Sequence, residues 1–151
     1  MARRDSAMSR SAAGILIAYT ALLLYTMFLG FNRPARRIYL PDFQYNLVPL
    51  RTVGDFVLHA GQHQPLDLII NLFGNVGVFV PFGILLPVLF RRCRRRPAVF
   101  AASFLGPLVL LELLQMLLRV GTFDVDDLLL NSIGAAIGYK LYRKARREGW
   151  V

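Results

Sequence analysis

The sequence predicts an all-α membrane protein, a polytopic bundle of about four transmembrane helices with both termini in the cytoplasm. Two observations lead to this class. The 151 residues are 56% hydrophobic, and a soluble domain of this size buries too little surface to hide so many apolar side chains. The formal net charge is nevertheless +9, and the basic residues lie between the apolar runs. The same composition excludes a disordered chain, and the single cysteine, Cys93, excludes a scaffold held by internal disulfides.

Spanning about 30 Å of hydrocarbon takes roughly 20 mostly apolar helical residues. We expect spans at about 12–31, 66–90, 98–120 and 127–142, which together form a transmembrane domain over 12–142. The first run follows three arginines, as a signal peptide would. It is longer than a typical signal core and lacks a small-residue cleavage pattern, so we interpret it as an uncleaved anchor.

The distribution of basic residues predicts the orientation. Three arginines lie in the tail 1–11, five in the loop 91–96, and five Lys or Arg follow from Lys140 onward, whereas the connection 32–65 holds four. Because basic residues favour the cytoplasmic side, we place both tails (1–11 and 143–151) inside and 32–65 outside a bacterial plasma membrane. The clusters would also face anionic lipid headgroups. They interleave no aromatic platform, so nucleic acid is not an expected partner.

Polar residues recur on one face of each of the last three spans. They are Asp67, Asn71 and Asn75, then Glu112, Gln115 and Arg119, then Asp127 and Asn131. Polar groups within a membrane are costly and usually face the protein interior. At 1.5 Å per residue, and with alternating span directions, all three stripes fall in the outer half of the bilayer. The sequence therefore predicts an outward-facing polar pocket, capped by Asp124, Asp126, Asp127 and the loop 32–65.

These residues also have structural interpretations. The amides could simply bond across helices, and Asp124 could be the N-cap of the fourth helix with Asp127 at N3. Glu112 is the strongest functional candidate, because an isolated carboxylate at that depth is unfavourable. Arg119 could reach outward, lean back toward Glu112, or meet the acidic cluster that begins at Asp124.

Other motifs indicate no cofactor and no metal. His59, His63 and Asp67 are spaced for a metal if helical, but Gly61 and Pro65 favour a loop there. No phosphate-binding loop, dinucleotide motif or CxxC pair occurs. Close packing of the fourth span is predicted by a GxxxG, which could also support a homo-oligomer through Gly134 and Gly138.

Three motifs, in order, resemble the VanZ-like family of bacterial membrane proteins. They are NLFGNVGVFVPFGILLP (71–87), LELLQ (111–115) and FDVDDLLLNSIGAAIGY (123–139), preceded by the N-x-x-P of 46–49. The resemblance covers about 46–142 and implies an integral membrane protein. It also implies that the polar residues carry the family pattern: Asn71, Asn75, Glu112, Gln115, Asp124, Asp126, Asp127 and Asn131. The family's named member is associated with resistance to the glycopeptide antibiotic teicoplanin.

The leading hypothesis is a protein of the cell envelope whose polar pocket binds a surface-exposed or lipid-linked ligand. A cell-wall precursor or a glycopeptide-related ligand is the expected partner, with a contribution to antibiotic resistance. One alternative is an intramembrane enzyme that acts on a lipid-linked precursor with Glu112 as general base, although no nucleophile–base pair is recognisable. A small transporter subunit, with Glu112 carrying protons, is the other.

Overall fold

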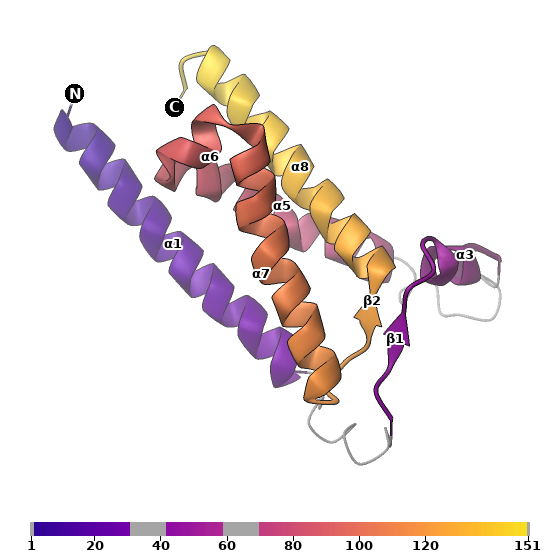
Figure 1. Ribbon diagram of the computed structural model, residues 1–151. Coiled ribbons are helices and arrows are strands. Elements are labelled where there is room, and N and C mark those ends of the chain that lie inside the picture. Colours follow the sequence, from indigo (N-terminus) through magenta and orange to yellow (C-terminus); the bar gives the residue numbers. More distant parts are fainter. Residues whose placement is uncertain (1, 31–41, 59–69, 151) are drawn as a thin grey trace.

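The computed structural model describes residues 2–30, 42–58 and 70–150, and it confirms the all-α class. Figure 1 shows long helices lying side by side, with two short strands at one end. The helices are α1 (Ala2–Phe28), α3 (Arg51–Leu58), a π-helical turn (Ile70–Gly74), α5 (Asn75–Leu89), α6 (Arg91–Arg95), α7 (Pro97–Leu117) and α8 (Val125–Arg147). The strands β1 (Tyr45–Asn46) and β2 (Phe123–Asp124) pair in parallel.

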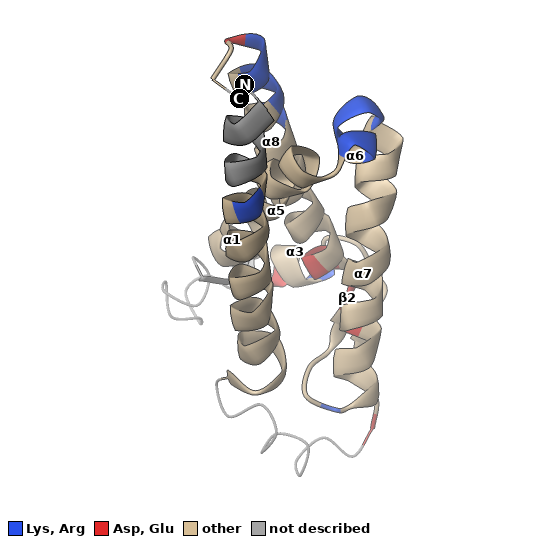
Figure 2. Ribbon diagram, turned by 90° about the vertical axis from the view of Figure 1, so that its left-hand side faces the viewer, with Lys and Arg blue, Asp and Glu red and all other residues tan. Residues whose placement is uncertain are grey.

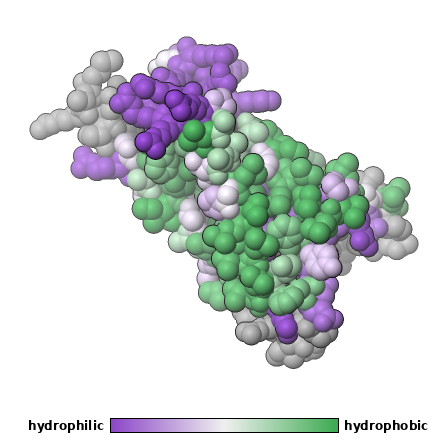
Figure 3. Space-filling model, in the orientation of Figure 1, coloured by the Kyte–Doolittle hydropathy of each residue, from purple (hydrophilic) through white to green (hydrophobic). Residues whose placement is uncertain are grey.

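Among the described residues, three helices are long and apolar enough to cross a membrane. Their apolar segments are Ser9–Phe28, Leu72–Leu89 and Pro97–Leu117, close to the first three predicted spans. Figure 3 shows hydrophobic residues covering the middle of the face in view, with hydrophilic residues gathered mainly toward its ends. The described chain therefore has the surface of a membrane protein.

The fourth predicted span, 127–142, is helical but does not meet the same requirement. α8 has two aspartates in its first turn and basic residues in its last turn, with Lys140 between them. These charges leave too short an apolar stretch, and α8 is not among the candidate spans of the described residues. α1 already begins at Ala2, so the described part of the predicted tail 1–11 is helical, and its cytoplasmic location stays a prediction.

α8 packs tightly along α5 through glycines. A Cβ added at Gly134 would overlap the carbonyl oxygen of Val76, and one at Gly138 would overlap that of Val80. Gly83 of α5 faces the backbone of α8 in the same way. The close packing predicted for the GxxxG is thus achieved within the chain, and both glycines are buried against α5. Self-association through them stays a prediction.

An aromatic core joins α5, α7 and α8 near α6. The rings of Phe100 and Tyr139 stack with their centroids 4.3 Å apart, and Phe79 meets Phe104 edge-on at 5.6 Å. The Tyr139 hydroxyl donates to the carbonyl of Cys93, whose side chain is buried. α6 and the last turns of α8 carry many Lys and Arg residues (Figure 2), and we call this end of the molecule the basic end of the bundle.

Candidate functional site

The opposite end, where α7 finishes and α8 starts, is the polar end of the bundle. Asp124 is its organising residue. It is the last residue of β2 and the N-cap of α8, as predicted, and its Oδ1 accepts from the backbone N–H of Asp126 at 2.8 Å. The same oxygen accepts from Asn46 Nδ2 at 3.2 Å, and Oδ2 accepts from the Thr52 hydroxyl at 2.6 Å. One carboxylate thereby fixes the start of α8, β1 and α3 together.

Asp126 holds the beginning of α3. Its Oδ1 accepts from the backbone N–H of Leu50 at 2.5 Å, and its Oδ2 accepts from that of Val53 at 3.1 Å. The first N–H groups of a helix lack partners within it, so Asp126 caps α3 from 76 residues away. The side chain is 1% exposed, and both of its oxygens serve the fold.

Asn75 and Asp127 are two of the predicted site residues that the structure brings together. Asn75 is the first residue of α5, and its Nδ2 donates to Asp127 Oδ1 at 2.7 Å. Asp127 lies in the first turn of α8, where a carboxylate also suits the helix dipole. This bond connects the first residue of α5 to the polar end.

Three more predicted site residues are buried farther from the ends of their helices. Glu112 and Asn131 are each 3% exposed, and Gln115 is 4% exposed. Glu112 lies five residues before the end of α7 and Asn131 six residues after the start of α8, depths of about 7.5 and 9 Å along the two helices. Figure 1 shows α8 starting part of the way back along α7, beyond β2, so these two depths are counted from different points along the bundle.

Gln115 and Asn131 differ in how their amides are used. Gln115 Nε2 donates to the carbonyl of Met27 at 2.9 Å and so ties α7 to α1. Asn131 Oδ1 is buried and has no hydrogen-bond partner among the residues that the structure describes. Natural proteins seldom leave such an atom unsatisfied, and each case calls for an explanation.

Arg119 contacts an aromatic ring that its sequence position did not indicate. It follows the end of α7 in a left-handed conformation with φ 57°, and its guanidinium lies 5.4 Å from the centroid of the Phe43 ring. A cation over a ring face is attracted by the ring's quadrupole. Nothing in the local spacing could have indicated a partner 76 residues away.

The structure adds Asn46 and Thr52 to the site. Thr52 Oγ1 accepts from Asn46 Nδ2 at 3.0 Å while it donates to Asp124, so the three side chains form one network. The β1–β2 register, with Asn46 opposite Asp124, explains the contact. The N-x-x-P motif that begins at Asn46 could have indicated that Asn46 belongs to the site. No motif in the sequence indicated Thr52.

Several predicted residues lie outside the described part of the chain. These are His59, His63, Asp67 and the side chain of Asn71. Within the ranges that are described, no group of three or more His, Cys, Asp or Glu side chains could hold a metal ion.

Comparison with known proteins adds two findings. A family model described as VanZ/LLP1 matches residues 16–146, from within α1 to the last turn of α8. Protein VanZ of Enterococcus faecium is 32% identical over 100 residues, which cover 64% of this chain and 51% of that protein. The match therefore spans about half the length of this curated relative. No solved structure matches the chain.

Proposed function

This chain belongs to the VanZ/LLP1 family, and from that premise we propose that it is an envelope protein of the bacterial plasma membrane that binds a surface-exposed or lipid-linked ligand at the polar end of its bundle. A cell-wall precursor fits this chemistry. Carboxylate and amide oxygens accept hydrogen bonds from hydroxyl and ammonium groups, and a lipid-linked saccharide or peptide carries both.

The buried Oδ1 atom of Asn131 is the main structural support for this proposal. It is a buried acceptor without a partner among the described residues. A buried acceptor without a hydrogen-bond donor costs about 1–3 kcal/mol in folding free energy. A ligand donor that reached this oxygen would remove that cost, so the apo protein holds an unfavourable feature that binding relieves.

The β1–α3 segment would cover the ligand. It is anchored to the first turn of α8 through the side-chain and backbone bonds to Asp124 and Asp126 described above, and through the two-residue strand pair. In our proposal these aspartates place the cover, while Glu112 and Asn131 contact the ligand. A contribution to teicoplanin-type resistance would follow if the ligand is a cell-wall precursor.

The test is antibiotic susceptibility in a teicoplanin-sensitive host with and without the gene. We expect the gene to raise the inhibitory concentration of teicoplanin, and Glu112→Gln or Asn131→Leu to return it to the level of the empty host. Ile133→Ala is the matched control, since Ile133 is half-exposed on the same helix. Full resistance in both site variants, at normal membrane levels, would contradict the proposal.

A further inference from the structure

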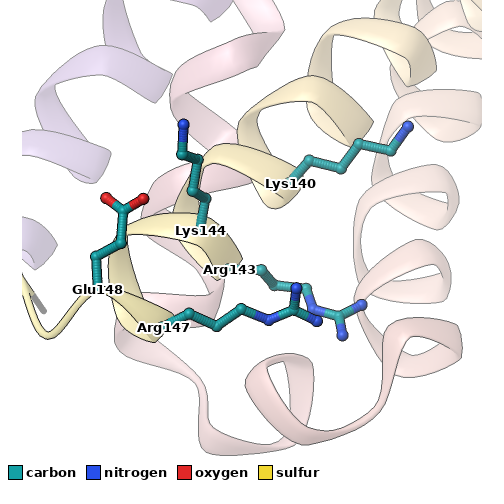
Figure 4. Close-up of a pocket in the computed structure, with 5 residues that line it drawn as sticks. All are labelled: Lys140, Arg143, Lys144, Arg147 and Glu148. Carbon is teal, nitrogen blue, oxygen red and sulfur yellow. The ribbon is translucent and has the colours of Figure 1, made fainter.

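Two adjacent concave surfaces lie at the basic end of the bundle, far from the polar end. The first has a volume of about 440 Å³ and is lined by Lys140, Arg143, Lys144, Arg147 and Glu148 (Figure 4). The second has a volume of about 300 Å³ and is lined by Arg94, Tyr142, Arg143, Arg146 and Arg147. Arg143 and Arg147 line both, so the two concavities share a wall.

The charge of this surface is strongly positive. Six basic side chains line the two concavities against one acid, Glu148. In Figure 4 the Arg143 and Arg147 side chains run in the same direction, as residues four apart on a helix do, and the Glu148 carboxylate points away from them. The helix dipole favours cations in the last turn of α8. It does not account for Lys140, which lies nearly two turns before the helix end, or for Arg94 on α6.

Arg94 is held in place by the backbone. Its Nε donates to the carbonyl of Pro87 at 3.2 Å and its Nη2 to that of Val88 at 3.1 Å. Both carbonyls belong to the last turn of α5, whose candidate membrane segment ends at Leu89, and the next such segment begins at Pro97. The guanidinium is therefore fixed beside the ends of two candidate spans, on the side where lipid headgroups would lie.

We propose that this surface binds the headgroup of an anionic phospholipid with two phosphate groups, one in each concavity. Arg143 and Arg147 lie between them and contact both phosphates, because a guanidinium offers several donors that match phosphate oxygens. Lys140 and Lys144 add charge on one side, and Arg94 and Arg146 on the other. Basic pockets next to membrane helices are suited to such headgroups. A lipid with one phosphate occupies only one of the two concavities.

The experiment compares lipids by native mass spectrometry of the full chain in detergent. Cardiolipin supplies two phosphates, phosphatidylglycerol one, and sodium pyrophosphate two phosphates without a lipid. The variant Arg143→Gln with Arg147→Gln removes the shared wall. Arg91→Gln with Arg95→Gln is the matched control: both residues are exposed on α6, carry the same charge and line neither concavity.

We expect cardiolipin to bind more tightly than the other two probes. The shared-wall variant should weaken cardiolipin binding about 30-fold, given roughly fivefold for each charge, and the control pair should weaken it far less. Equal loss in both pairs would mean diffuse charge attraction and would overturn the proposal. So would binding of phosphatidylglycerol or pyrophosphate as tight as that of cardiolipin.

Discussion

Asp126 shows how much one buried side chain contributes to the polar end. The sequence placed it in an acidic cluster above a pocket, and its two oxygens instead accept the first free N–H groups of α3. Asn131 is its opposite, because its buried oxygen serves no described part of the fold. Both carboxylate oxygens of Asp126 accept hydrogen bonds within the described fold, whereas the amide oxygen of Asn131 accepts none. We therefore assign Asp126 a structural role and Asn131 a role in binding.

Replacing Asp126 with Asn should release the β1–α3 segment. An amide presents an N–H₂ group where a carboxylate oxygen accepted, so at least one cap bond is lost. We expect a loss of about 1–3 kcal/mol in the free energy of unfolding, measured by denaturant titration in detergent, with faster hydrogen exchange over 45–58. Asp42→Asn, at an exposed carboxylate, should leave both unchanged. Protection of 45–58 at the normal level in Asp126→Asn would exclude the capping role.

Asn131→Leu should behave differently. Leucine has the same branching and the same number of side-chain heavy atoms but no polar atom, so it removes an unsatisfied acceptor from a buried position. We expect thermal unfolding in detergent at the normal temperature or above it, because replacing an unpaired polar group by an apolar one is neutral or favourable. A marked fall in the melting temperature would show that the amide holds the bundle together, and the site would lose its main support.

At the scale of elements, α5 and α8 form the most closely packed pair of described helices. Its helices approach so closely that Gly83, Gly134 and Gly138 leave no room for a side chain. Asn75 at the start of α5 and Asp127 at the start of α8 extend the contact to the polar end. α1 is attached more loosely, through bonds such as that from the Tyr19 hydroxyl to the carbonyl of Val78 at 2.9 Å.

Gly134→Ala tests this packing. The added methyl group would overlap the carbonyl oxygen of Val76, so the two helices must separate. We expect the free energy of unfolding to fall by about 1–3 kcal/mol, as overpacking does in other cores. Gly77→Ala is the matched control on α5, since a Cβ there meets nothing within 4 Å, and it should be neutral or stabilising by up to about 1 kcal/mol. Equal effects in the two variants would argue against the close approach.

Local sequence properties predicted some of these elements but not the contacts between distant segments. Apolar length predicted the three candidate spans, although it also predicted a fourth that α8 does not meet. Residue type predicted the Asp124 N-cap, because capping depends on local properties. The contacts of Asp124, Asp126 and Arg119 with residues 43–53 could not be predicted, since no periodicity links segments more than 70 residues apart. Nor could spacing alone place the partner of Gly134 and Gly138, because a GxxxG fits a helix of the same chain as well as one of another.

At the scale of the whole molecule, α8 connects two chemically opposite ends. It begins with the acidic N-cap and ends in a basic turn, and its 23 residues extend about 33 Å, close to the thickness of a bilayer's hydrocarbon core. Figure 2 shows most Lys and Arg at one end and acidic residues toward the other. This polarity is what the positive-inside orientation requires.

The orientation can be measured by cysteine labelling in intact cells. In a Cys93→Ala background, Asp55→Cys on α3 should react with a membrane-impermeant maleimide added outside, because the polar end is predicted to face outward. Arg91→Cys on α6 should react only after permeabilisation. Both positions are exposed, so reactivity reports the side of the membrane. The reverse pattern would place the polar end in the cytoplasm.

Direct titration tests the proposal that the polar end is a binding site. The purified full chain in lipid nanodiscs would be titrated with a lipid-linked cell-wall precursor, and the bound fraction measured for the natural chain, Glu112→Gln, Asn131→Leu and Ile133→Ala. We expect saturable binding by the natural chain and by Ile133→Ala, lost or strongly weakened in the two site variants although both melt normally. Unchanged saturable binding in both site variants, or none by the natural chain, would contradict the proposal.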